Sequence, residues 1–199
     1  MEITFVGGWA SDSAQYPVLA GSARVLVPFS GFRPEELPQL IAENSGVLLS
    51  WSTGAHMLLK DCLHLFPQFD QVILIAPFLA FTDSFPERLV RRMIAGMAVN
   101  PAEVVASFYA NCGEERDLAF DESLTPALTE GLEYLISSRF EPEKTVSIDN
   151  LTLVHGIQDK IVRGRAFERV KEFFVPGRIV TPDCGHKISE QVLLELIRA

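Results

Sequence analysis

The sequence is poor in cysteine, and its few cysteines are not arranged as metal ligands or as disulfide pairs. It has three, Cys62, Cys112 and Cys184, and no two of them have the C-x-x-C spacing. An odd count without that spacing argues against a disulfide framework and against a zinc ribbon. Reduced thiols in a cytosolic protein are the simpler interpretation, and we therefore expect a cytoplasmic location.

Basic residues and long apolar runs are also scarce. The chain has 17 Lys and Arg against 26 Asp and Glu, which gives a net charge of −9. Nucleic-acid binding relies on a basic surface, so we expect no nucleic-acid partner. No apolar run approaches the roughly 18 residues that cross a bilayer, and the opening MEITFVGGWAS lacks the basic start of a signal peptide. We expect neither a membrane span nor a signal peptide.

The composition is that of a globular protein with a substantial core. Its 199 residues are 48% hydrophobic and 22% charged, which fits one domain over residues 1–199. Several short runs are apolar throughout instead of alternating, as in parallel strands that helices cover on both faces. We predict an α/β fold with a mainly parallel sheet of about six strands. The predicted strands are 3–6, 24–29, 46–51, 71–76, 151–155 and 178–180, and helices are expected at 34–44, 53–65 and 188–198.

One segment, residues 78–146, interrupts this alternation of strands and helices. It contains no convincing strand pattern, but helical patterns run over about 84–98, 101–111 and 124–138. An insertion between the fourth and fifth strands lies at the carboxyl edge of a parallel sheet, where ligands bind. We therefore predict a helical lid over a site at that edge.

The stretch SWSTG, residues 50–54, marks the first candidate for a catalytic group. Ser52 lies between the third predicted strand and the following helix. A nucleophile on such a sharp turn is lifted clear of the sheet, and its neighbours must be small. Gly54 meets that requirement, whereas Ser50 stands where glycine is usual. Serine also caps helices and S-x-G triplets arise by chance, so this stretch alone leaves both roles open.

Two later residues complete a constellation with Ser52. Asp159, in HGIQDKIV, follows the fifth predicted strand, and His186, in DCGHKI, follows the last one. Carboxyl ends of parallel strands meet at one edge, and the order Ser, Asp, His is that of an α/β-hydrolase triad. In such a triad, the histidine takes the serine proton and the carboxylate orients the ring. Taken singly, Asp159 is compatible with a solvated turn and His186 with a core or capping role.

A tetrahedral oxyanion needs two backbone N–H donors. Thr53, directly after the nucleophile, is one candidate. The loop GGWAS after the first strand is expected to supply the other, through Trp9 or, as the weaker choice, Gly8. A simple turn is the alternative interpretation of Gly7-Gly8.

A metal site is the competing interpretation of the same region. Its ligands would be His155, Asp159, Cys184 and His186. Nothing in their spacing requires a metal, so we expect no metal and no cofactor. The remaining histidines, His56 and His64, lie on the helix after Ser52 and are interpreted as structural, as is His155, which is the nearest of the three to the predicted site.

Together these motifs resemble those of the α/β-hydrolase superfamily over most of the chain. FVGGWAS matches its oxyanion loop, LLSWSTGAHMLL its nucleophile elbow, LVHGIQDKIV the acid and DCGHKI the base. Within the superfamily, GGWAS and SWSTG look like the carboxylesterases of biotin synthesis, which cleave the methyl ester of pimeloyl-acyl carrier protein. The resemblance implies a serine carboxylesterase and a pimeloyl methyl ester substrate.

Arg88, Arg91 and Arg92 lie on one helical face of the predicted lid because of their i, i+3, i+4 spacing. Biotin-pathway esterases are thought to meet their acidic carrier protein through lid arginines, so the resemblance implies such a contact here. Residues 78–146 nevertheless carry 6 Lys and Arg against 12 Asp and Glu, and a solvated face explains the arginines equally well. A general small-ester esterase or thioesterase, and a non-catalytic binding protein with this fold, remain as alternatives.

Overall fold

The structure is a computed structural model that describes residues 2–114 and 119–198. Its six strands form one sheet in the order β2-β1-β3-β4-β5-β6, and every neighbouring pair is parallel. The predicted α/β class and six-stranded parallel sheet are confirmed. The strands are β1 (Ile3–Val6), β2 (Arg24–Leu26), β3 (Val47–Trp51), β4 (Gln71–Ile75), β5 (Val146–Val154) and β6 (Phe174–Val180).

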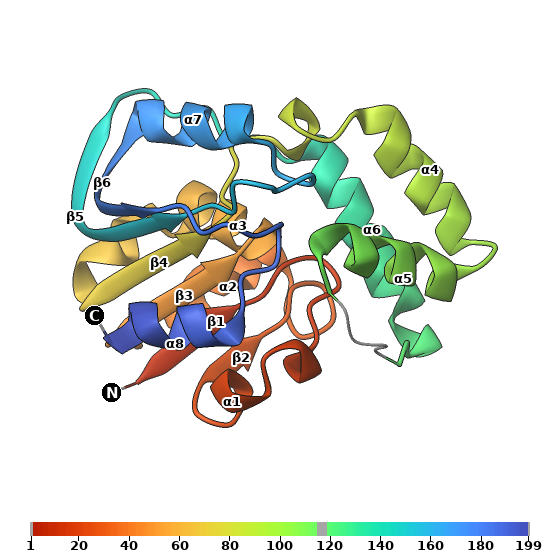
Figure 1. Ribbon diagram of the computed structural model, residues 1–199, viewed down its shortest axis with the longest axis horizontal. Coiled ribbons are helices and arrows are strands. Elements are labelled where there is room, and N and C mark those ends of the chain that lie inside the picture. The colour runs from red at the N-terminus through yellow and green to blue at the C-terminus, as the bar shows by residue number, and fades with distance from the viewer. Residues whose placement is uncertain (1, 115–118, 199) are drawn as a thin grey trace.

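Helices cover both faces of this sheet, as Figure 1 shows. Successive side chains of a strand point to opposite faces, and in β3 both sets are apolar. Leu49 packs into one hydrophobic cluster and Leu48 into the other. The first cluster includes residues of α1 (Pro17–Ala20) and α8 (Glu190–Arg198), and the second includes residues of α2 (Leu37–Ile41), α3 (Thr53–Asp61) and α7 (Gly164–Phe173).

The helix α7 is absent from the sequence prediction, and two strands begin earlier than predicted. Half of the ten residues of α7 are charged, so its buried side, Ala166, Phe167 and Val170, is hard to recognise in the sequence. β5 begins at Val146, the last residue of the predicted insertion, and β6 begins at Phe174. The first half of β5 is partly exposed and contains polar residues, whereas β6 contains Pro176 and Gly177 and buries only Phe174. Neither sequence therefore has the continuous apolar run of a buried strand.

Three helices fill the segment between β4 and β5: α4 (Glu87–Met97), α5 (Pro101–Cys112) and α6 (Thr125–Ser137). Local signals fix the ends of α5. Asn100 accepts a hydrogen bond from the Glu103 N–H at the start, and Gly113 adopts φ +88° after the last turn. Figure 1 shows the three helices together beyond the carboxyl ends of the strands. None of the helices in the described residues is long and apolar enough to cross a membrane.

The two ends of this segment are joined to each other. Ala80 and Arg139 form an antiparallel bridge, and the Phe140 N–H donates to the Leu79 carbonyl at 2.9 Å. The chain that enters the helical layer is thereby paired with the chain that leaves it. This arrangement gives the helices α4 to α6 a common base on the sheet.

His56, on α3, links both ends of that base to the helix that follows Ser52. The ring is fully buried, with Nδ1 3.0 Å from the Phe78 carbonyl and Nε2 2.8 Å from Ser138 Oγ. A carbonyl only accepts, so Nδ1 carries the proton and Nε2 accepts from the serine hydroxyl. Burial, as the largest cause, lowers the pKa of His56 from 6.5 to about 4. His56 is therefore neutral near pH 7, in line with the structural role that we predicted for it.

Acid is expected to weaken the folded state through His56. Between pH 6.5 and about 4 the unfolded chain binds a proton at this residue and the folded chain does not, so the free energy of unfolding falls as the pH falls. The loss is at most about 3 kcal/mol and is complete below the folded pKa. Urea unfolding of the native protein and of His56→Gln at pH 7, 5.5 and 4 measures it. Equal pH slopes for the two proteins would contradict this role for His56.

Candidate active site

Ser52 forms a strained turn between β3 and α3. Its backbone adopts φ +54° and ψ −111°, a left-handed conformation that is rare for a residue with a side chain. The turn is held on both sides, because the Ser52 N–H donates to the Ile75 carbonyl at 2.8 Å and the Ser52 carbonyl accepts from His56 at 3.0 Å. The Ser52 side chain makes no capping hydrogen bond to α3. Its hydroxyl is thus available for another partner.

The small neighbours of Ser52 have separate structural reasons. A Cβ on Gly54 would lie 2.4 Å from the Gly7 carbonyl oxygen and 2.7 Å from that of Val6. Ser50 is tolerated where glycine is usual because its buried hydroxyl donates to the Val6 carbonyl at 3.0 Å. The hydroxyl of Ser50 thus bonds to the neighbouring strand β1 and does not compete for the site.

Gly54→Ala is expected to lower the free energy of unfolding by more than about 2 kcal/mol, because the new methyl group meets rigid backbone oxygens. Gly164→Ala is the matched control, since a Cβ there meets nothing within 4 Å. Urea denaturation compares the two variants with the native protein. Similar denaturation midpoints for both variants would show that the turn can accommodate an extra methyl group at position 54.

The side chains of Ser52, His186 and Asp159 form a continuous hydrogen-bonded chain. His186 Nε2 lies 2.9 Å from Ser52 Oγ, and Nδ1 lies 2.7 Å from Asp159 Oδ2. The other carboxylate oxygen, Oδ1, accepts from the backbone N–H groups of Ile161 at 2.8 Å and Val162 at 2.9 Å. The imidazole and the carboxylate are completely buried. The structure thus brings together the three side chains that the order of the motifs predicts, in the geometry that general-base chemistry needs.

Three contacts that the sequence did not reveal hold the loop of His186. The Trp51 indole N–H donates to the His186 carbonyl at 3.0 Å, and the Lys187 N–H donates to the carbonyl of Cys112 at 2.9 Å. The Lys187 ammonium also pairs with the buried carboxylate of Glu114, just beyond the end of α5. The histidine loop is therefore fixed both to β3 and to the helical layer.

His155 supports the loop of Asp159. Its Nε2 lies 2.7 Å from the Val162 carbonyl, to which it donates, and its ring stacks on Phe167 at 4.6 Å. Val162 in turn donates its N–H to Asp159. The Nε2 nitrogen of His155 is thus engaged with the backbone. Among the described residues no group of three or more His, Cys, Asp or Glu side chains is arranged to hold a metal ion.

The two predicted oxyanion donors lie next to each other. The Trp9 N–H donates to Thr53 Oγ1 at 3.2 Å, and Thr53 begins α3, where backbone N–H groups lack helical partners. The competing Gly8 N–H donates to Ser11 Oγ at 2.6 Å, a shorter hydrogen bond than the 3.2 Å one of the Trp9 N–H. This pairing favours Trp9 over Gly8 as the donor from that loop.

The three lid arginines are all exposed on α4, but they do not share one environment. Arg91 forms an ion pair with Glu87 at 2.6 Å within the helix. Arg92 lines a pocket between α4 and α5, whereas Arg88 lines none of the main pockets of the described residues. The guanidinium groups of Arg88 and Arg92 therefore form no ion pair within α4.

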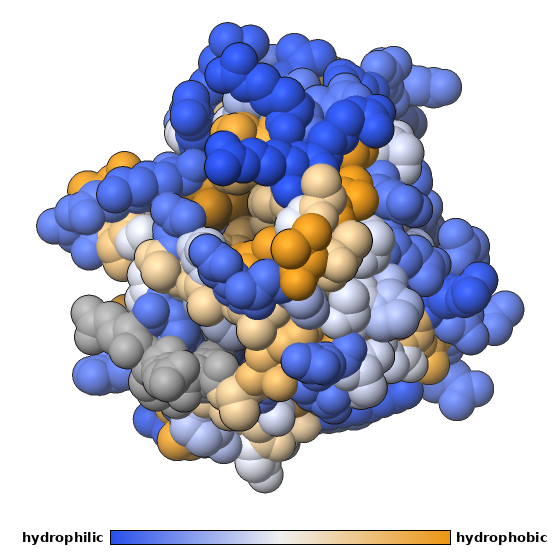
Figure 2. All heavy atoms as spheres, turned by 90° about the vertical axis from the view of Figure 1, so that its right-hand side faces the viewer, coloured by the Kyte–Doolittle hydropathy of each residue, from blue (hydrophilic) through white to orange (hydrophobic). Residues whose placement is uncertain are grey.

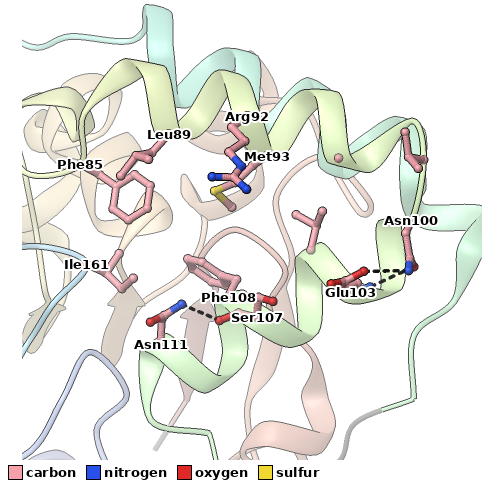
Figure 3. A pocket seen from close by; sticks show the side chains of 13 residues that line it. Phe85, Leu89, Arg92, Met93, Asn100, Glu103, Ser107, Phe108, Asn111 and Ile161 are labelled. Carbon is pink, nitrogen blue, oxygen red and sulfur yellow. Dashed lines mark hydrogen bonds between the residues drawn. The ribbon is translucent and has the colours of Figure 1, made fainter.

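A pocket of about 390 Å³ opens between α4, α5 and the loop of Asp159. Figure 3 shows Phe85, Met93, Phe108 and Ile161 along its inner wall, with Arg92 reaching in from α4. Figure 2 shows the opening in this face, with hydrophobic side chains inside and hydrophilic residues on the rim. The apolar lining suits an aliphatic chain.

The pocket does not reach Ser52, which is 4% exposed. Phe108 separates them, because its ring lines the pocket and packs edge-on against Trp9 with centroids 4.7 Å apart. The side chain of Trp9 is itself fixed by a hydrogen bond of 2.8 Å from its indole N–H to the Leu128 carbonyl. One aromatic layer therefore lies between the pocket and the oxyanion donors.

Solved structures share this fold. An esterase from Exiguobacterium antarcticum superposes with a TM-score of 0.66 at 14% identity, covering 100% of this chain and 92% of its own. A type II thioesterase from the borrelidin biosynthetic cluster gives 0.60 at 15%, covering 98% and 87%. A bromoperoxidase from Bacillus anthracis gives 0.64 at 15%, covering 100% and 92%.

No protein-family model matches the chain, and no curated protein sequence matches it. The chain has the α/β-hydrolase fold, which the sheet order and these superpositions establish together. Identities this low show the fold alone, and one fold carries many activities. The activity of this chain therefore depends on the chemistry of its site and does not follow from its fold.

Proposed function

We propose that the protein is a serine hydrolase that cleaves acyl esters through an acyl-serine intermediate. The observation that carries the proposal is the unbroken chain from Ser52 Oγ through His186 to Asp159, with contacts of 2.9 and 2.7 Å. A strained serine next to a buried, carboxylate-bound histidine has no evident value for stability. Strain of this kind is typical of functional sites.

The hydrogen bonds fix the direction of proton transfer. The Ser52 hydroxyl donates to His186 Nε2, and Nδ1–H donates to Asp159, so Nε2 holds the free lone pair. As Ser52 Oγ attacks the ester carbonyl, Nε2 takes the hydroxyl proton and Asp159 stabilises the resulting imidazolium. The imidazolium then protonates the leaving alkoxide, which departs as the alcohol and leaves the acyl-serine.

The second half-reaction repeats these roles with water. His186 takes a proton from water, the hydroxide attacks the acyl-serine, and the imidazolium returns the proton to Ser52 Oγ as the acid leaves. In both halves the negative oxygen of the tetrahedral intermediate is stabilised by the N–H groups of Trp9 and Thr53. The Trp9 N–H gives up its 3.2 Å bond to Thr53 Oγ1 for the stronger charged acceptor.

The proposed substrate is an ester with an apolar acyl chain. The pocket of about 390 Å³ beside the Asp159 loop would hold that chain, with Phe108 displaced so that the ester reaches Ser52. The motifs GGWAS and SWSTG support, as the more specific proposal, a cytoplasmic carboxylesterase that cleaves pimeloyl-acyl carrier protein methyl ester without a cofactor. The lid arginines Arg88, Arg91 and Arg92 would meet the acidic carrier protein.

A panel of substrates tests this proposal. It contains short and medium p-nitrophenyl esters, matched thioesters, and pimeloyl-carrier-protein methyl ester. We expect Ser52-dependent turnover of esters, with the carrier-bound methyl ester giving the highest kcat/KM. Faster turnover of thioesters would make the protein a thioesterase. No turnover of any substrate by a folded protein would favour a binding protein with this fold.

Replacing Arg88, Arg91 and Arg92 together with glutamine is expected to lower kcat/KM for the carrier-bound ester by about tenfold or more, because charge complementarity governs encounter. In Arg88→Gln/Arg91→Gln, turnover of p-nitrophenyl butyrate should stay within about twofold, since that ester presents no acidic surface and neither side chain lines the apolar pocket. Steady-state kinetics on both substrates checks this expectation. An equal loss of kcat/KM on both substrates would contradict a contact between these arginines and the carrier protein.

A further inference from the structure

A second, polar pocket lies outside the proposed active site, where the start of α7 meets the base of the helical layer. Its volume is about 230 Å³. Figure 1 shows the first turn of α7 at the end of the helix nearest that layer. The residues that line the pocket are Asp83, Arg139, Arg165, Ala166, Arg169 and Glu172.

The charge around this pocket contrasts with that of the whole chain. Residues 160–171 carry five Lys and Arg and a single acid, Glu168, in a protein of net charge −9. Lys171 already pairs with Glu168 at 2.7 Å. Within the part of the chain that the structure describes, Arg165 and Arg169 form no ion pair. No ion pair among the described residues therefore neutralises these two guanidinium groups, and together with Arg139 they outnumber the two carboxylates of the lining, Asp83 and Glu172.

Neither the helix dipole nor the spacing of Arg165 and Arg169 from each other favours these two arginines. Arg165 lies in the first turn of α7, which has no acidic residue, and a cation there opposes the helix dipole. Arg165 and Arg169 are four residues apart, a spacing at which like charges repel. A bound anion would reverse both effects, because helix N-termini favour negative charge.

We propose that this pocket binds a phosphate group. Arg165 and Arg169 face it from α7, and Arg139 faces it from the other side, at the base of the helical layer. Arg139 lies 3.8 Å from Asp83, too far for a hydrogen bond, so its guanidinium keeps its donors. Guanidinium groups suit the several oxygens of phosphate through paired N–H donors.

The phosphate pocket is lined by residues close in the chain to residues that line the apolar pocket. Asp83 lines the phosphate pocket, and Phe85 lines the apolar one. Likewise, Arg165 lines the phosphate pocket and Ile161 the apolar one. Ser84 joins the two segments, because its Oγ accepts from the Arg163 N–H at 3.0 Å. This placement therefore favours a phosphate-bearing acyl donor as the ligand. That choice of ligand rests on the proposed function. A free phosphorylated metabolite shares the same chemistry.

Isothermal titration calorimetry with inorganic phosphate tests the site without any reaction. We expect binding by the native protein and a rise in Kd of at least about tenfold in Arg165→Gln/Arg169→Gln. Lys144→Gln/Arg178→Gln is the matched control, because it removes two exposed charges that do not line the pocket. No binding by the native protein, or equal Kd values for the two double variants, would overturn the proposal.

Kinetics then separates the two sources of phosphate. The substrates are the monomethyl ester of pimeloyl-pantetheine with and without the terminal phosphate of pantetheine. If the arm of an acyl donor fills the site, the Arg165/Arg169 variant raises KM for the phosphorylated substrate alone, by about tenfold. Unchanged KM values together with lost phosphate binding assign the site to a free phosphorylated ligand. Failure of native protein to cleave either substrate counts against the proposed function and leaves the calorimetric result intact.

Discussion

Ser52→Ala is expected to lower kcat for p-nitrophenyl butyrate by at least about 10⁴-fold. The reason is that the acyl-enzyme route disappears with the nucleophile, while the oxyanion donors and the pocket remain. Residual turnover should therefore exceed the reaction in water. The free energy of unfolding should change little or increase, because Ser52 is strained at φ +54° and its hydroxyl bonds only within the site.

Ser50→Ala is the matched control for this variant. It removes the same hydroxyl two residues away, from a side chain that donates to the Val6 carbonyl and does not touch His186. We expect it to cost about 1 kcal/mol of stability and to keep kcat within about tenfold. If Ser50→Ala lost as much activity as Ser52→Ala, the effect would belong to the turn and not to the nucleophile.

Asp159→Asn is expected to lower kcat by about 10⁴-fold without unfolding the protein. One carboxylate oxygen accepts from Ile161 and Val162, so the asparagine carbonyl should keep that side and turn its amide nitrogen toward His186. An amide N–H there donates to Nδ1 and forces the proton onto Nε2. The histidine would then face Ser52 with a proton in place of a lone pair, and it could not act as the base.

Steady-state kinetics and the nitrogen NMR shifts of His186 check this tautomer directly. Asp183→Asn serves as the control, because it makes the same change on the exposed neighbouring loop, where the carboxylate accepts only from Gln158. That variant should retain native kcat. Full activity in Asp159→Asn would show that the carboxylate does not orient His186.

The sheet and the convergence of the three site residues could be predicted because their signals are local. The strand before Ser52 is apolar on both faces, and the turn requires a glycine at position 54. Asp159 and His186 each follow a recognisable strand. Once the sheet is parallel, its topology alone places such residues at one edge.

The missing elements have no such local signal. The helix α7 carries charges on half its positions, and in this structure some of those charges line a pocket instead of a solvated face. Lys187 belongs to the DCGHKI motif, but its partner Glu114 lies 73 residues away and outside any motif. The burial of that ion pair depends on where α5 packs, which pattern and spacing do not determine.

Partial burial explains the remaining errors. The first halves of β5 and β6 pair with each other at the edge of the sheet, where one face stays open to solvent. The polar residues of β5 and the Pro176-Gly177 pair of β6 therefore resemble loop sequence. His56 was correctly interpreted as structural, but its two partners lie at opposite ends of the helical segment, and sequence order gives no indication that these ends meet.

The central claim is that Ser52 is a nucleophile activated by His186. Labelling with a fluorophosphonate probe, followed by peptide mass spectrometry, tests it most directly. We expect one label per chain, located on Ser52, full labelling of Ser50→Ala, and none of Ser52→Ala. Absence of label on the folded native protein, or undiminished labelling of Ser52→Ala, would contradict it.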